Sequence, residues 1–216
     1  MAFPIIYLLV LFTAAASATI WWKSLVNRAL FPFVPVLWIV FLQELTLHIL
    51  VLRNPMLSTG GVYNIYGLLN MIFFAAIYFR LPFHRPYRRL IIGLVVTYVA
   101  AFALTFALSQ SVMVYNKYLF ISAGFIIDCL GLLFLFNYFS LDDAAEEEKW
   151  RPLLWITIGI VIHYPVVNIS LSLYNHLLEN KATFFGVRLY RVIPQTMSVF
   201  MYTCFIYAFY LCKKKN

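Results

Sequence analysis

The chain alternates between long apolar runs and short segments that are polar, basic or proline-containing. Seven runs come close to the roughly 20 residues that a helix needs to cross a hydrocarbon core about 30 Å thick. Barrel-type alternation is absent, and helices satisfy their backbone hydrogen bonds internally. The pattern predicts an all-α, polytopic transmembrane helix bundle that forms a single domain over residues 1–216. We expect spans at 3–22, 30–52, 62–79, 90–110, 118–140, 153–173 and 193–212.

Lysines and arginines between the runs predict the orientation, because cytoplasmic loops carry an excess of these residues. With the N-terminus outside and the C-terminus in the cytoplasm, eleven fall on the inner side and five on the outer side. The inner ones are Lys23, Arg28, Arg80, Arg85, Arg88, Arg89, Lys149, Arg151, Lys213, Lys214 and Lys215. The outer ones are Arg53, Lys117, Lys181, Arg188 and Arg191, three of which lie in the last connection.

The first run resembles a signal peptide, because residues 14–18 (AAASA) are similar to a cleavage site. Two features argue that it stays as a span. No basic residue precedes the run, and the first one, Lys23, follows it. Cleavage would also leave six spans and place the basic loop 80–89 outside, against the charge rule.

Composition agrees with a membrane protein: 64% of the residues are hydrophobic and 11% are charged, against roughly 25% charged in soluble domains. The net charge of +8 lies in short flanking runs. No soluble basic face is indicated, so we expect the lipid bilayer as partner and no nucleic acid. Cys129, Cys204 and Cys212 are scattered through apolar stretches and are expected to be packing residues, without a disulfide framework or a metal motif.

Few polar residues lie at membrane depth, where an ionisable group costs about 2.5–3.5 kcal/mol at mid-helix on insertion scales. The predicted helix directions place most of them in the outer half. We therefore expect an outward-facing polar pocket that binds a small molecule or a lipid, between the second, third, fifth, sixth and seventh spans. Its candidate ligand-binding residues are Glu44, His48, Asn64, Asn70, Asp128, His163, Asn168 and Gln195.

These residues leave several interpretations open. Glu44 and His48 are four apart and share a helix face, so they form either a structural pair or a pair that binds a ligand or a proton. Asp128 either pairs with His163 or is protonated. Together the four have the chemistry of a metal site or an acid/base cluster, but no metal-binding motif supports this, and we expect no metal and no cofactor. The spans also lack the interior lysine that a retinal protein needs.

Two connections carry candidate surfaces. The outer segment 174–191 mixes basic and aromatic residues, and is either an interfacial anchor or a site for an anionic ligand or headgroup. The inner run 142–148 is acidic. We expect it to be a solvated loop, with docking of a basic cytoplasmic partner as the alternative.

Three stretches carry a resemblance to a group of proteins. Residues 62–66 (VYNIY) open the third span, 151–156 (RPLLWI) open the sixth, and 202–210 form an aromatic seventh span. In these the chain resembles small seven-helix integral membrane proteins of bacteria, which have no established activity. The resemblance implies a seven-helix fold in a bacterial inner membrane, and no site residues.

The functional expectation is a receptor-like or sensory membrane protein. Ligand binding in the outward-facing pocket would move helices, and a separate cytoplasmic signalling partner would sense the movement. Three alternatives stand beside it: an intramembrane lipid-modifying enzyme using Glu44, His48, Asp128 and His163, a proton-coupled transporter, and a structural subunit of a larger membrane complex.

Overall fold

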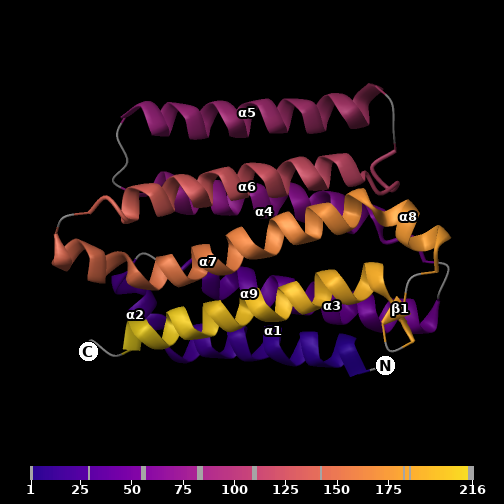
Figure 1. Cartoon of the computed structure of the whole chain (residues 1–216), viewed down its shortest axis with the longest axis horizontal. Helices are drawn as coiled ribbons and strands as arrows, with labels where there is room; N and C mark the ends of the chain where they lie inside the picture. The colour runs from indigo at the N-terminus through magenta and orange to yellow at the C-terminus, as the bar shows by residue number, and fades with distance from the viewer. Residues whose placement is uncertain are drawn as a thin grey trace.

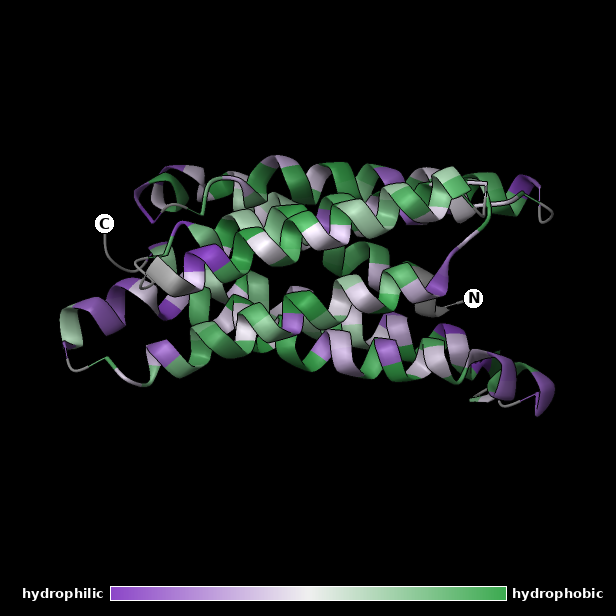
Figure 2. Ribbon diagram, turned by 90° about the horizontal axis from the view of Figure 1, so that it is seen from above, coloured by the Kyte–Doolittle hydropathy of each residue, from purple (hydrophilic) through white to green (hydrophobic). Residues whose placement is uncertain are grey.

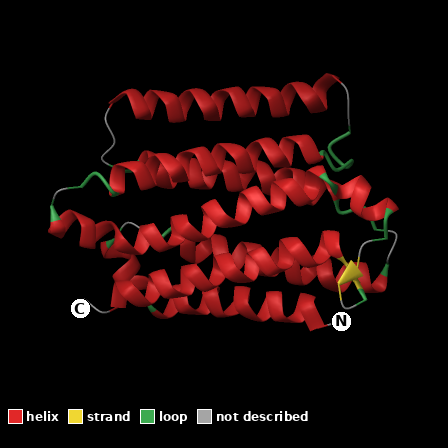
Figure 3. Ribbon diagram, viewed as in Figure 1, coloured by secondary structure: helices red, strands yellow, loops and turns green. Residues whose placement is uncertain are grey.

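The computed structural model describes residues 2–28, 30–54, 57–81, 85–108, 111–141, 143–181, 183–184 and 186–213. Long helices run side by side and are joined by short connections (Figures 1 and 3). The long helices are α1 (Ala2–Ile20), α3 (Phe33–Arg53), α4 (Gly60–Phe79), α5 (Arg85–Leu108), α6 (Lys117–Tyr138), α7 (Ala144–Ser172) and α9 (Leu189–Lys213). The short elements are α2 (Trp22–Asn27), α8 (Tyr174–Glu179), β1 (Thr183–Phe184) and β2 (Val187–Arg188).

Six of these helices are long and apolar enough to cross a membrane: α3, α4, α5, α6, α7 and α9. The chain is therefore a helical, multi-pass membrane protein. Helix α1 is apolar as well, but its stretch Ile5–Ile20 is shorter than the other six. Figure 2 shows hydrophobic residues along the helices and hydrophilic ones gathered at their ends, which is the distribution that a bilayer requires.

The helices follow the predicted spans closely, except that α5, α7 and α9 begin earlier than predicted. Helix α5 begins at Arg85 rather than 90. Helix α7 begins at Ala144 rather than 153, so the expectation of a loop over 142–148 was wrong for its described residues. The Asp143 side chain accepts a hydrogen bond from the Ala145 amide and caps this helix. Helix α9 begins at Leu189 rather than 193. The predicted span end at Gln110 and the residues Asp142, Phe185, Lys214 and Lys215 lie outside the described residues.

Helix α7 lies between α6 and α9 and packs closely on both. Beyond α9 comes α1, and α3 packs on α1. On the other side α4 packs on α6, and α5 packs on α4 and α6 at the edge of the bundle (Figure 1). A Cβ added to Gly159 of α7 would lie 3.0 Å from the Cβ of Cys204 and 3.2 Å from the Met201 carbonyl oxygen. Glycine at 159 thus permits the close approach of α7 and α9.

The predicted outer connection, residues 174–191, folds into α8 and a small antiparallel hairpin. Strands β1 and β2 pair Thr183 with Arg188. Gly186 in the turn has φ 75°, a conformation that glycine adopts without strain. The rings of Tyr174 and Tyr190 stack edge-on with centroids 5.0 Å apart, which joins α8 to the start of α9.

At the predicted inner side, Arg28 links the end of α2 to the start of α7. Its guanidinium donates hydrogen bonds to the carbonyl oxygens of Glu148 at 3.1 Å and Lys149 at 2.8 Å. The side chains of residues 143–149 are exposed. The first turns of α7 are therefore an acidic helical extension that is tied to the bundle through backbone groups rather than buried in it.

Candidate functional site

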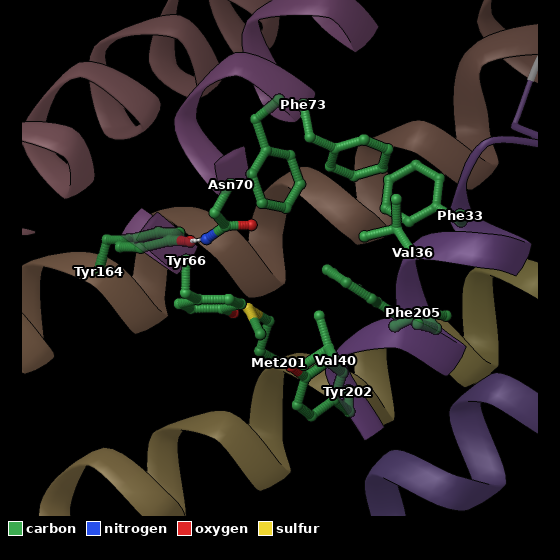
Figure 4. Close-up of a pocket in the computed structure, with 12 residues that line it drawn as sticks. Phe33, Val36, Val40, Tyr66, Asn70, Phe73, Tyr164, Met201, Tyr202 and Phe205 are labelled. Atoms are coloured by element: carbon green, nitrogen blue, oxygen red, sulfur yellow. Dashed lines mark hydrogen bonds between the residues drawn. The ribbon is translucent and has the colours of Figure 1, made fainter. Parts of the chain in front are cut away.

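A small cavity of about 20 Å³ lies between α3, α4, α7 and α9 (Figure 4). Such a volume holds one water-sized group. Most of its wall is aromatic or aliphatic, and the polar groups come from three tyrosines and one asparagine. The lining residues are Phe33, Val36, Leu37, Val40, Tyr66, Asn70, Phe73, Phe74, Tyr164, Met201, Tyr202 and Phe205.

Aromatic packing holds the helices apart around this space. The ring of Phe33, on α3, contacts Phe73 edge-on at a centroid distance of 5.0 Å and Phe205 at 5.6 Å. Helix α3 therefore meets α4 and α9 through large side chains, whereas its closest packing is on α1. Bulky rings at a helix interface leave more space than small residues do, which accounts for the cavity in this part of the bundle.

A hydrogen bond between α4 and α7 lies at one wall of the cavity. The Asn70 Nδ2 group donates to the Tyr164 hydroxyl. Figure 4 shows the Asn70 side-chain oxygen turned away from Tyr164 toward the interior of the cavity. Asn70 thus has one group that joins two helices and one acceptor that faces the space between them.

Glu44 lies just beyond the cavity on the same face of α3. Val36 and Val40 line the cavity, and Glu44 follows them at the spacing of four residues that keeps side chains on one face. Its carboxyl hydrogen bonds the Tyr63 side chain and lies within electrostatic range of Tyr66 and Tyr202.

Tyr66 and Tyr202 are themselves joined by a side-chain hydrogen bond. The ring of Tyr7, on α1, lies against Tyr202 with centroids 6.2 Å apart. Four tyrosines from three helices therefore lie within electrostatic range of the Glu44 carboxyl. In the part of the chain that the structure describes, no hydrogen bond joins Glu44 to His48, which lies half-buried one turn further along α3.

Asp128 is 7% exposed and lies where α6 meets α4 and α7. It is in electrostatic range of Tyr78 and Tyr164. Its Oδ1 atom has no hydrogen-bond partner among the described residues. Asp128 does not line the cavity; Tyr164 lies on the cavity wall, and α6 contributes no residue to it.

His163 and Asp128 do not pair among the described residues. His163 is 8% exposed and hydrogen bonds the backbone of Met197 on α9, and its Nδ1 has no partner among the residues that the structure describes. The two residues lie at similar depth, but His163 turns to α9, whereas Asp128 lies at the α4 and α7 contact. No three histidine, cysteine, aspartate or glutamate side chains in the described ranges lie close enough to hold a metal ion. The acid/base cluster on which the enzyme alternative depends is therefore not assembled there.

Asn168 and Gln195 also lie away from the cavity lining. The Asn168 Nδ2 group donates to the Ile121 carbonyl at 3.3 Å, which ties α7 to α6. The side-chain oxygens of Asn168 and Gln195 are buried, and neither has a hydrogen-bond partner in the described part of the chain. Asn168 thus serves the α6–α7 contact.

Asn64 holds the loop between α5 and α6. It is 5% exposed, and its Nδ2 group donates to the carbonyl oxygens of Val112 and Val114, both at 2.8 Å. Its Oδ1 atom accepts from the Asn116 amide at 3.0 Å. A Cβ on Gly60 would lie 2.5 Å from the Met113 carbonyl oxygen, so glycine is needed for this approach. The amide of Asn64 is saturated by backbone groups, which makes it a loop anchor.

Of the eight predicted site residues, Asn70 lines the cavity and Glu44 lies at its edge. Sequence reasoning missed the three tyrosines that supply the other polar groups, Tyr66, Tyr164 and Tyr202. A signal existed, because tyrosine carries a hydroxyl that needs a partner when it lies in a bundle core. Weighing tyrosines together with charged and amide residues would have selected them.

Comparison with protein-family models, with curated proteins and with solved structures finds no match to this chain.

Proposed function

We propose that this chain is a receptor-like or sensory protein of the bacterial inner membrane, with seven spans, its N-terminus outside and its C-terminus in the cytoplasm. A small molecule or a lipid binds in the cavity between α3, α4, α7 and α9. The bound ligand shifts these helices, and a separate cytoplasmic partner senses the shift. The observation that carries the proposal is the tyrosine- and asparagine-lined cavity among aromatic side chains.

Helix α3 is suited to move on ligand binding. It touches α4 and α9 through rings such as Phe33, and only four of its 21 residues are buried. Rings can change rotamer without breaking backbone hydrogen bonds. A ligand larger than the present cavity would therefore be admitted by displacement of α3 rather than by unfolding.

Helix α7 connects the cavity to the inner surface. Tyr164 lines the cavity, and the same helix runs back without a break to Ala144. Its 29 residues give a length of about 44 Å at 1.5 Å per residue, against about 30 Å for a hydrocarbon core. A rotation or tilt at Tyr164 would thus reach the exposed Glu146 and Glu147, where a basic surface of the partner would bind.

The test is to extract the protein from its native membrane in lipid nanodiscs and identify bound small molecules and lipids by native mass spectrometry. Val40 lines the cavity and is 7% exposed, so V40F fills the space. We expect wild type to retain a bound species that V40F loses. The matched control is L42F on the same helix, because Leu42 is 55% exposed; L42F is expected to retain the species. Identical bound species in all three proteins would refute the cavity as the ligand site.

The partner is tested by cross-linking from the α7 extension. A photoreactive residue at position 147, which is exposed, is expected to capture a cytoplasmic protein in cells expressing wild type. Reversal of the acidic charge, E146K together with E148K, is expected to abolish the capture. If the same protein is captured after charge reversal, the proposal that a basic partner surface binds the acidic start of α7 is wrong.

A further inference from the structure

We propose that the ligand of this cavity carries a protonated primary amine, which inserts among the aromatic rings with Glu44 as its counter-charge. The inference rests on the proposed function and assigns the chemical class of the ligand. Four features of the cavity carry it: its size, its aromatic wall, the adjacent carboxyl, and the free hydrogen-bond acceptors.

The size of the cavity selects the head group. About 20 Å³ accepts one water-sized group, and an ammonium group on a carbon chain has nearly the dimensions of water. A trimethylammonium group or an aromatic ring is several times larger. A primary amine is therefore the cationic group that fits with the least movement of the helices.

The wall of the cavity attracts a cation. Phe33 and Phe73 lie on one side, and Tyr66, Tyr202 and Phe205 close the other (Figure 4). The faces of such rings carry negative electrostatic potential, and cages of aromatic rings are a recurrent way to bind ammonium ligands. Removal of water from the site strengthens this attraction.

Glu44 supplies the counter-charge. It continues the lining face of α3 by one turn beyond Val40 and lies within electrostatic range of Tyr66 and Tyr202. No basic side chain acts on its carboxyl among the described residues. A buried ionised carboxylate is costly unless it is paired. An ammonium group in the adjacent cavity provides a counter-charge that the described residues do not.

Acceptors for the three N–H groups are available within the cavity. Asn70 donates through its Nδ2 to Tyr164, which leaves its side-chain oxygen facing the space (Figure 4). Tyr66 and Tyr202 also line the cavity, and their hydroxyl oxygens keep lone pairs that can accept even though the two hydroxyls hydrogen bond each other. A primary ammonium can use these acceptors and a quaternary ammonium cannot, because it has no N–H. A metal ion would require more oxygen ligands than one amide and two hydroxyls supply.

The experiment uses the purified full-length protein in nanodiscs, with n-butylammonium chloride as the probe. The competitors are n-butanol, which is a neutral analogue, and tetramethylammonium chloride, all at one ionic strength set with NaCl. Isothermal titration calorimetry is expected to show saturable binding of n-butylammonium. Binding of n-butanol and tetramethylammonium should be at least tenfold weaker. Equal binding of n-butanol would overturn the inference.

Variants locate the charge. E44Q is expected to weaken n-butylammonium at least tenfold, and E44D, which keeps the carboxylate, to restore part of the affinity. D128N is the matched control, because Asp128 is a buried carboxyl that does not line the cavity; its affinity should stay within threefold of wild type. Equal losses in E44Q and D128N would show a general charge effect and overturn the assignment.

Failure of this inference differs from failure of the proposed function. If native mass spectrometry finds a neutral species that V40F loses, while n-butylammonium does not bind, the cavity stands and the amine is wrong. If n-butylammonium binds wild type and V40F equally, the amine lies elsewhere and this inference fails, while the species retained by wild type and V40F still decide the cavity assignment. A Glu44 variant is compared with wild type only if it elutes as one monodisperse species in size-exclusion chromatography and its circular dichroism spectrum is helical.

Discussion

The side-chain amide of Asn70 donates a hydrogen bond to the hydroxyl of Tyr164, and this bond crosses from α4 to α7 at the wall of the cavity. It is one of the few polar contacts between these two helices in the described ranges. Helix–helix hydrogen bonds in membranes contribute about 0.6 kcal/mol on average, with a maximum of about 1.7 kcal/mol. The contact is therefore strong enough to favour one arrangement and weak enough to be replaced by a ligand.

A double-mutant cycle tests this contact. N70L and Y164F each remove one partner, and we expect a coupling energy between about 0.6 and 1.7 kcal/mol in reversible unfolding by SDS. As a control pair, N70L and T203V should add without coupling, because the Thr203 hydroxyl bonds the Val199 carbonyl of its own helix. Strict additivity of N70L and Y164F would contradict the bond.

The approach of α7 and α9 at Gly159 predicts a large steric effect. G159V should destabilise the bundle by about 1–3 kcal/mol, because overpacking forces a backbone shift, and the added Cβ would lie 3.0 Å from the Cβ of Cys204. G93V is the matched control, since no atom of the described residues lies within 4 Å of a Cβ at Gly93 of α5. Thermal unfolding in detergent checks both, and equal midpoints would refute the tight contact.

Loss of the Asn64 anchor should free the loop between α5 and α6. N64L removes three hydrogen bonds to the loop backbone. We expect faster amide hydrogen exchange at residues 112–116 and a destabilisation of about 1–3 kcal/mol from the unpaired backbone groups. N137L serves as the control because Asn137 bonds the Leu133 carbonyl within its own helix. Unchanged amide hydrogen exchange in N64L would show that the loop is ordered without the Asn64 hydrogen bonds.

The proposed orientation is testable by labelling intact cells with a membrane-impermeant maleimide. In a background that replaces the native cysteines by alanine or serine, K181C should label from outside and E147C should not. Both positions are exposed in the structure, so accessibility differs between them only through the membrane. After the cells are opened, E147C should label as well. Labelling of E147C in intact cells would reverse the orientation.

Whether the chain has seven spans or six depends on α1, whose stretch Ile5–Ile20 is shorter than the six candidate spans. If α1 crosses, the two ends of the chain lie on opposite sides. A green fluorescent protein fused after the C-terminus should then fluoresce, and an epitope tag before Met1 should react with antibody on intact spheroplasts. An inaccessible N-terminal tag would leave six spans.

The helices could be predicted because long apolar runs have few alternatives in a bilayer. The start of α7 could not be predicted in the same way. By hydropathy alone, the charged stretch 146–151 lies outside the membrane span, so the helix is expected to begin after it. Local signals for the helix were nevertheless present: Asp143 as the capping residue and Glu146 and Glu147 in the first turn.

The candidate site was harder to predict for a geometric reason. Counting residues along a span gives the depth of a side chain in the membrane but not the direction in which it points within the bundle. Asp128 and His163 have similar depths and face different helices, whereas Asn70 and Tyr164 meet. Only the packing of whole helices decides such directions, because each helix can rotate about its axis without changing its hydropathy.

The loop anchored by Asn64 has a consequence for how the chain tolerates change. Because it fastens the start of α6 directly to the start of α4, and because these two helices pack on each other, their register depends little on α5, which adds the hydrogen bond from the Tyr98 hydroxyl to the Leu119 carbonyl of α6. Outside its buried positions Ile91 and Tyr98, helix α5 is therefore free to vary in sequence as long as it stays apolar. Random substitution should find α5 the most permissive of the long helices, and α7 the least.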